Sequence, residues 1–209
     1  MLHFNFGALP LCCLMILSVP LVSCNREPAA PAVRAERVPL TPVTVEVRDD
    51  GLAYLPGTTT PFTGEAITPY PDTPWLVKLK EPYTDGKRDG EKLEYFKNGQ
   101  VKHLRRYNKG VPEYGASYHR NGQMKVEIHL NAQDKAEGPY QRWYEDGTLE
   151  AAADFDALER WHNDFREWDS EGKPKSHYQF KNGVMQKIIF ETEESKKARL
   201  EKGMEPANP

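Results

Sequence analysis

Residues 90–107 read GEKLEYFKNGQVKHLRRY, and residues 138–155 read GPYQRWYEDGTLEAAADF. Both stretches begin with Gly, place an aromatic residue five positions later and a second Gly four positions after that, and both end on an aromatic residue. Several matching positions at a fixed spacing indicate a repeat architecture, in which each repeat packs only on its neighbours.

The same pattern occurs in four copies. The second glycine of each copy, called the turn glycine below, is Gly99, Gly122, Gly147 or Gly172, at intervals of 23, 25 and 25 residues. Four positions before each turn glycine lies one member of an aromatic column: Tyr95, Tyr118, Trp143 and Trp168. Eight positions after each turn glycine the residue is large and hydrophobic: Tyr107, Leu130, Phe155 and Phe180.

Each turn glycine follows Asn98, Asn121, Asp146 or Glu171. Asn-Gly and Asp-Gly between strand-like runs are the strongest short-range hairpin signal, because a type I′ turn needs positive φ at both central residues. We therefore expect type I′ turns at Asn98-Gly99, Asn121-Gly122 and Asp146-Gly147. A second turn signal follows each outgoing run, near residues 108–110, 131–134, 156–157 and 182–183. Two turns in about 24 residues predict an all-β fold, an elongated antiparallel β-meander of repeated hairpins.

The runs that follow the turn glycines alternate in polarity. In the first copy one side carries Val101 and Tyr107, and the other carries Lys102, Leu104 and Arg106. Alternation with period two is typical of antiparallel strands with one buried face. The sequence therefore predicts a sheet with one apolar-aromatic face and one charged face. The spacing is irregular around Gly115, which predicts a β-bulge there.

The N-terminus contains a 15-residue apolar run, residues 9–23, that ends in Leu21-Val22-Ser23-Cys24. The run is shorter than the roughly 20 residues of a membrane span but fits the core of a signal peptide. Its end resembles the bacterial lipobox, which implies cleavage before Cys24 and lipid attachment to that residue. Residues 1–7 contain no Lys or Arg, which departs from the usual signal, and the alternative is a plain buried apolar segment with a free cysteine. By the same resemblance, Asn25 after the cysteine favours the outer membrane.

These signals divide the chain into four parts: a lipoprotein signal peptide at 1–23, a Pro-rich tether at 24–42, a repeat sheet at 43–186, and a short helix with a disordered tail at 187–209. The sheet part begins with a hairpin around Asp50-Gly51 and a degenerate first repeat at Gly64. The helix contains few large apolar residues, and we expect it to cover the open end of the sheet.

Composition limits the function classes. The chain has 209 residues and a net charge of −3 with both signs mixed, which argues against general nucleic-acid binding. All three cysteines precede residue 25, so neither a disulfide framework nor a multi-cysteine metal site is expected. No catalytic motif is present, and the histidines are scattered. We expect no enzyme activity, no cofactor and no metal.

Two groups of residues are candidates for binding. The aromatic column of Tyr95, Tyr118, Trp143 and Trp168 indicates either cross-strand packing or a platform for sugar rings or a partner, since a single sheet leaves one apolar face uncovered. The basic cluster of Lys102, Arg105 and Arg106 indicates either contact with anionic lipid headgroups or an ordinary exposed strand.

Several of these segments resemble a known family. Residues 83–90 with 95–99, and 138–140 with 143–147, resemble the MORN-repeat variant of bacterial secreted proteins and lipoproteins, often labelled as an antitoxin component of toxin–antitoxin systems. The resemblance covers roughly residues 50–187 and implies an elongated sheet of hairpins. The resulting hypothesis is a non-enzymatic envelope lipoprotein whose sheet binds a protein, glycan or lipid partner. The alternative is an antitoxin-like inhibitor that binds a toxin protein.

Overall fold

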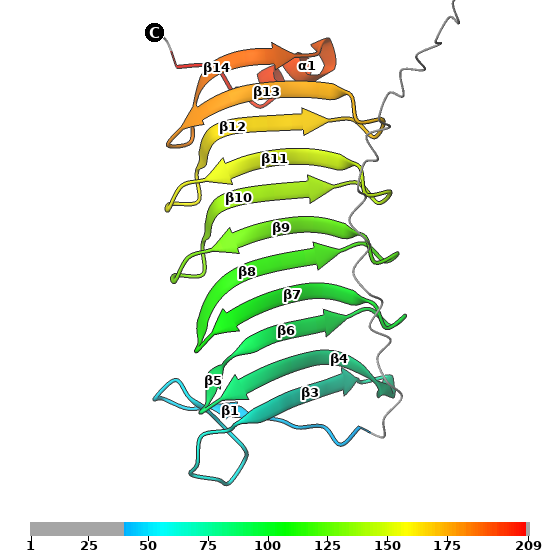
Figure 1. Cartoon of the computed structure of the whole chain (residues 1–209), viewed down its shortest axis with the longest axis vertical. Helices are drawn as coiled ribbons and strands as arrows, with labels where there is room; N and C mark the ends of the chain where they lie inside the picture. Colours follow the sequence, from blue (N-terminus) through cyan, green and yellow to red (C-terminus); the bar gives the residue numbers. More distant parts are fainter. Residues whose placement is uncertain (1–39, 208–209) are drawn as a thin grey trace, which may run out of the picture.

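Residues 40–207 are described by the computed structural model of this chain. Their main body is one 12-stranded sheet in which all pairings are antiparallel and the strands follow one another in chain order, except that both the short β5 and β6 pair with β4 (Figure 1). Its strands are β3 (Gly64–Tyr70), β4 (Thr73–Thr84), β5 (Lys87–Arg88), β6 (Gly90–Tyr95), β7 (Val101–Asn108), β8 (Val111–Tyr118), β9 (Met124–Leu130), β10 (Ala136–Trp143), β11 (Leu149–Phe155), β12 (Trp161–Trp168), β13 (Pro174–Lys181) and β14 (Val184–Glu191). The predicted β-meander is confirmed.

A small hairpin precedes the sheet. Strands β1 (Glu46–Val47) and β2 (Ala53–Tyr54) pair around the predicted Asp50-Gly51 turn. Ala53 is fully buried and packs with Ala66 and Tyr83 of the first two sheet strands. The predicted signal peptide and most of the tether lie outside the described residues.

The turns at the turn glycines lie where the sequence predicts, but their type is different. The N–H of Gly99 donates to the carbonyl of Phe96 at 2.9 Å, and Gly99 has φ 86° while Asn98 is not among the residues with positive φ. Each loop is therefore a three-residue turn closed by one left-handed glycine. Asn98 instead accepts the N–H of Gln100 with its side-chain oxygen, at 3.2 Å. Such a side-chain bond favours Asn in turns without positive φ.

Pairs of consecutive residues with positive φ occur in the turns at the other ends of the strands. They are Asp85-Gly86, Lys109-Gly110 and Asn182-Gly183. These are the positions that meet the type I′ requirement, because a two-residue hairpin turn needs both central residues in the left-handed region.

A β-bulge follows every turn glycine. In the first repeat Glu94 pairs with His103 and Tyr95 pairs with Val101, so that Lys102 has no pairing partner. The register is interrupted at the same place in the other three repeats, where the extra residues are Lys125, Glu150 and Lys175. A bulge residue breaks the alternation of faces. The prediction that Lys102 shares a side with Leu104 and Arg106 is therefore wrong.

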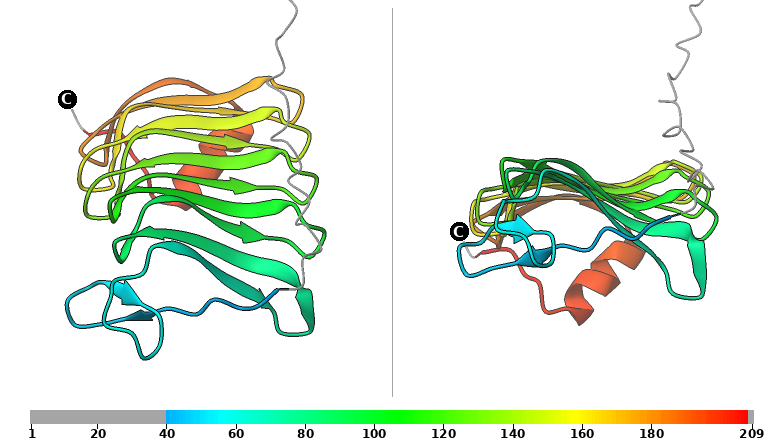
Figure 2. Two further views of the ribbon diagram at one scale, coloured as in Figure 1. Left: turned by 60° about the horizontal axis from the view of Figure 1, so that its bottom comes forward. Right: turned by 90° about the horizontal axis from the view of Figure 1, so that it is seen from below.

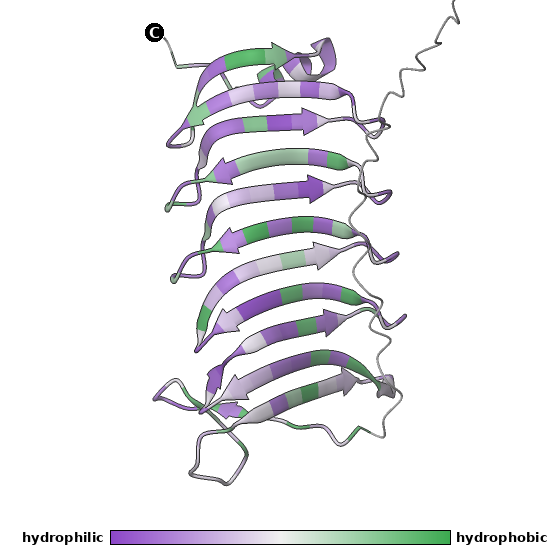
Figure 3. Ribbon diagram, viewed as in Figure 1, coloured by the Kyte–Doolittle hydropathy of each residue, from purple (hydrophilic) through white to green (hydrophobic). Residues whose placement is uncertain are grey.

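The irregularity expected near Gly115 is present. Arg106 pairs with Tyr114 and Tyr107 pairs with Pro112, which leaves Glu113 as an extra residue two positions before Gly115. Hydrophobic and hydrophilic residues alternate along many of the strands, and the turns at both edges are mainly hydrophilic (Figure 3).

The sheet is curved, and helix α1 (Glu193–Glu201) and the β1–β2 hairpin both lie on its concave side (Figure 2). The helix begins six residues later than expected, because β14 continues to Glu191. It covers the concave face near the last strands rather than the open edge. The expected disorder after Gly203 is wrong as far as residue 207, since Met204 packs on the core and the N–H of Ala207 donates to the carbonyl of Met185 at 2.7 Å.

Candidate binding face

One row of residues crosses the sheet from β6 to β14 and identifies the concave face. Each member pairs directly with the next, and directly paired residues share a face. The row consists of Glu94, His103, Ser117, Val126, Arg142, Ala151, Glu167, Ser176 and Glu191. Its last member binds Arg199 of α1, so the row lies on the concave side.

The aromatic column lies on the opposite, convex face. Each of its four members follows a concave-row residue directly in the chain, and successive residues of a strand point to opposite faces. Each member pairs with an aliphatic or proline residue of the next strand: Val101, Met124, Leu149 or Pro174. In residues 40–207 no ring contact joins two members of the column. The aromatic contacts that do form lie mainly on the concave face.

The column backbone also joins successive repeats. The carbonyl of Tyr95 accepts the Tyr70 hydroxyl at 2.5 Å, and the carbonyl of Trp168 accepts the Tyr144 hydroxyl at 2.9 Å. The His119 ring nitrogen lies 3.0 Å from the carbonyl of Trp143. These positions are 24 or 25 residues apart, so the repeat period places each side chain beside the next repeat's carbonyl.

The basic cluster is divided between the two faces. Arg105 pairs with Lys92 and Gly115 on the concave side, and its guanidinium lies 3.0 Å from Asp134. Arg106 lies on the convex side, where it forms an ion pair with Glu91 at 2.9 Å. Lys102 is a bulge residue whose ammonium lies 3.0 Å from Glu94 of the concave row. The cluster is therefore not one continuous patch.

The middle of the concave face contains a hollow of about 410 Å³ between β6 and β9. Its lining includes polar and charged residues of β6 and β7 and three apolar or aromatic residues of β7 and β9: Lys92, Glu94, His103 and Arg105, then Tyr107, Val126 and Ile128. Burial lowers the pKa of His103, and the nearby positive charges of Lys102 and Lys125 act in the same direction against Glu94. We call this hollow the central hollow.

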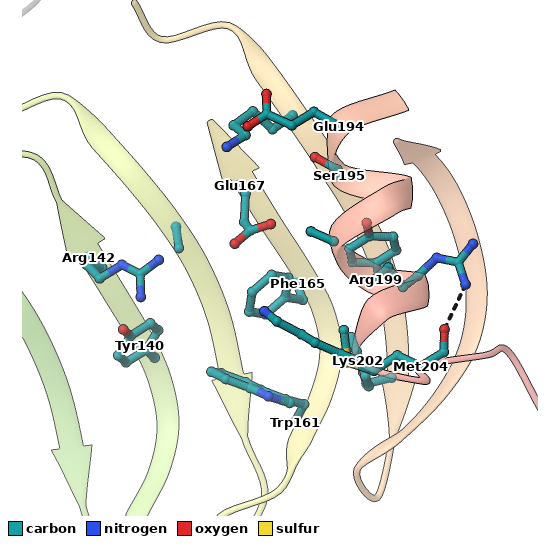
Figure 4. Close-up of a pocket in the computed structure, with 15 residues that line it drawn as sticks. Tyr140, Arg142, Trp161, Phe165, Glu167, Glu194, Ser195, Arg199, Lys202 and Met204 are labelled. Carbon is teal, nitrogen blue, oxygen red and sulfur yellow. Dashed lines mark hydrogen bonds between the residues drawn. The ribbon is translucent and has the colours of Figure 1, made fainter. Parts of the chain in front are cut away.

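A second cavity, of about 450 Å³, lies between the concave face and α1 (Figure 4). Its sheet side is aromatic: the Trp161 ring stacks on Phe155 at 4.3 Å and meets Phe165 edge-on at 5.0 Å. Tyr140 lies edge-on to Trp161 at 5.8 Å. Polar groups on the rim come from both sides, among them Arg142 and Glu167 of the sheet and Lys202 at the end of the helix. We call it the helix cavity.

Helix α1 is fixed to the sheet by a buried ion pair. Arg199 and Glu191 are 6% and 12% exposed, and two hydrogen bonds of 2.9 and 3.1 Å join them. The hydrogen bond from Arg199 lowers the pKa of Glu191. Burial and a hydrogen bond to Glu191 raise the pKa of Tyr178 to about 12. The helix cavity therefore keeps a fixed wall at neutral pH.

The arrangement can hold a ligand but contains no metal cluster within residues 40–207, where no group of three or more His, Cys, Asp or Glu side chains could hold an ion. Over the same range no helix is long and apolar enough to cross a membrane. Cys24 lies outside the described residues. The turn glycines lie in the turns at one end of the strands and line neither of the two cavities.

The sequence did not indicate the main residues of the helix cavity, which are Tyr140, Arg142, Trp161 and Phe165. Arg142 directly precedes a member of the aromatic column, so it belongs to the opposite face by simple alternation. That signal was present in the sequence. Phe165 occupies the position of Tyr140 in the repeat, seven residues before the turn glycine, whereas Trp161 lies beyond a register irregularity, so only its pairing with Phe155 places it on the concave side.

Comparison with protein families matches two segments, residues 88–109 and 136–157, to the MORN repeat variant. The two segments contain both stretches quoted at the start, and each covers a strand, a turn with its glycine and the bulged strand that follows. Comparison with curated proteins found no match. MORN repeats are generally non-catalytic binding or scaffolding modules, and the two matched segments support a MORN-repeat protein.

Proposed function

We propose that this chain is a non-enzymatic binding module that holds a partner protein on its concave face and is attached to a cell-envelope membrane through lipid on Cys24. The observation that carries the binding part is the open stretch of concave face between the β1–β2 hairpin and α1. Two hollows of about 410 and 450 Å³ lie on that face.

The shape of the face favours an extended polypeptide over a single small molecule. The concave row crosses nine strands, and strands lie about 4.8 Å apart, so the row is roughly 40 Å long. Charged groups lie in the central hollow and aromatic groups in the helix cavity. An extended segment with acidic residues and one large apolar side chain would complement both.

Attachment through Cys24 rests on the apolar run and the lipobox-like sequence that ends it. The experiment is metabolic labelling with a palmitate analogue. Label should be present in the wild type and in a Cys12→Ala/Cys13→Ala variant, and absent from Cys24→Ala. Label that persists in Cys24→Ala would exclude lipid attachment at this cysteine.

The second candidate is an antitoxin-like inhibitor of a toxin protein, which would use the same concave face. It rests on the resemblance to repeats that carry the antitoxin label. Co-expression with each neighbouring gene distinguishes it: rescue from a toxic neighbour that is lost when the concave face is altered would favour inhibition. Absence of any toxic neighbour would remove this candidate.

A further inference from the structure

The helix cavity is a feature of this chain's C-terminus as well as of its repeats. One wall comes from β10 to β13, and the other from α1 and Met204. Without α1 the aromatic side chains of Trp161 and Phe165 would face open solvent. The cavity is therefore a place where a flat or bulky apolar group can be enclosed on two sides.

Two cationic groups border the aromatic part of this cavity. Lys202 reaches from the end of α1 toward the sheet (Figure 4), and within the described part of the chain its ammonium has neither a hydrogen bond nor an ion pair. Arg142 approaches from β10. It forms an ion pair with Glu150, whose oxygen lies 2.8 Å from the Arg142 Nε, and the two terminal nitrogens of the guanidinium remain as further donors.

The cavity also contains two acidic side chains, Glu167 and Glu194. Glu167 already accepts a hydrogen bond from the hydroxyl of Ser176 at 2.8 Å. Glu194 belongs to the first turn of α1, whereas Lys202 caps its last turn. The aromatic end of the cavity therefore has one cation without a partner among the described residues, Lys202, and beside it the Arg142–Glu150 ion pair, and cationic donors form their strongest hydrogen bonds with a carboxylate.

We propose that the helix cavity binds a carboxylate attached to a bulky apolar body, with the body against Trp161 and Phe165 and the carboxylate between Lys202 and Arg142. The C-terminal residue of a polypeptide has this chemistry, and so does a small aromatic acid. The inference rests on the proposed function in using the concave face, and it assigns a ligand class to one end of that face.

The test uses the full chain in detergent micelles and follows the indole N–H signal of Trp161 by NMR, assigned with a Trp161→Phe variant. The probes are a tripeptide that ends in Phe with a free carboxylate, the same tripeptide with an amidated end, and 3-phenylpropionate. We expect saturable shifts with a free carboxylate and at least tenfold weaker binding of the amide, because amidation removes the charge that faces both Lys202 and Arg142. Lys202→Ala should weaken binding by a similar factor, and Lys197→Ala, on the exposed side of the same helix, should not.

Binding of the peptide acid alone would support the proposal and point to a polypeptide C-terminus, and binding of phenylpropionate alone would support it with a small acid as the source. Equal binding of acid and amide would overturn it, as would unchanged binding by Lys202→Ala or no shift with either acid at millimolar concentration. A negative result leaves the central hollow untouched, so it does not contradict the proposed function, which is tested separately by cross-linking from β9.

Discussion

Arg199 and Glu191 form a doubly hydrogen-bonded ion pair that joins helix α1 to the last strand of the sheet, with Nε–Oε2 and Nη2–Oε1 distances of 2.9 and 3.1 Å. Arg199 also donates to the carbonyl of Met204 at 2.7 Å. The buried residues of α1 are Ser195 and Arg199, and its one large aliphatic residue, Leu200, is 47% exposed. The helix is thus attached mainly through a polar contact.

Replacing Arg199 should therefore release α1 from the sheet. Removing one partner of a buried ion pair typically costs about 3–5 kcal/mol, because the other charge loses its compensation. In Arg199→Ala we expect the amides of Glu193–Glu201 to lose hydrogen-exchange protection while the amides of β7 to β11 keep theirs. The matched control is Arg166→Ala, since the Arg166–Asp164 pair is 48% and 36% exposed and should contribute about 0–1 kcal/mol. Unchanged protection of α1 in Arg199→Ala would show that other contacts hold it.

The attachment of α1 should also depend on pH. The folded-state pKa of Glu191 lies below its ordinary value of 4.5, mainly because of the hydrogen bond from Arg199. A lowered folded-state pKa stabilises the docked helix fully above 4.5, and this contribution is lost as the pH falls through the lowered value. We expect exchange protection of α1 to fall below pH 4.5. In Glu191→Gln the helix should be less protected at pH 7 and its protection should change less with pH. An equal acid dependence in both proteins would assign the effect to other groups.

Substitutions at two left-handed turn positions, Gly172 and Lys109, should change the free energy of unfolding by different amounts. Gly172 has φ 77° and an added Cβ would have its nearest neighbour at 3.8 Å, so Gly172→Ala should destabilise through backbone strain alone, by about 1–2 kcal/mol. Lys109 is exposed and has φ 48°, so Lys109→Gly should remove strain and change stability by less, in the favourable direction or near zero. Urea unfolding midpoints measure both. A stable Gly172→Ala would contradict the turn geometry described here.

Arg105 and Arg106 are neighbours in sequence but lie on opposite faces. Variants of each can therefore distinguish partner binding on the concave face from lipid binding on the convex face. If a partner binds the central hollow, Arg105→Glu should weaken its binding and Arg106→Glu should not. If anionic lipid headgroups bind the convex side, the effects on liposome binding should be reversed. Both single variants remove one exposed ion pair, with Asp134 or Glu91, so their effects on stability should be similar.

The sequence located the turns well because glycine and asparagine have strong local preferences, and the repeat period made each signal visible four times. It did not give the turn type, because that depends on the hydrogen bond that the Asn98 side-chain oxygen accepts from the N–H of Gln100. The bulges at Lys102 and its equivalents depend on how two strands pair. No local pattern distinguishes them from regular alternation.

The docking of α1 was hidden for a related reason. A search for an apolar helical stripe finds none in residues 193–201, since the contact is made by Arg199 with a carboxylate eight positions earlier in another element. The concave-face position of Lys102 was missed for the same reason, because it also depends on how two strands pair. Simple alternation assigned Lys102 to the charged side, whereas the bulge turns it toward Glu94 on the concave face.

The most direct test of the central claim compares two adjacent residues of β9. Val126 belongs to the concave row and lines the central hollow, and Glu127 pairs with Ala116 on the convex face. A photo-reactive phenylalanine replaces one or the other in the full chain, and cells are irradiated before the cross-linked proteins are identified. We predict one defined partner cross-linked from position 126 and not from position 127, with loss of that product when Arg105→Glu is added. The same product from position 127, or none from position 126, would contradict binding on the concave face.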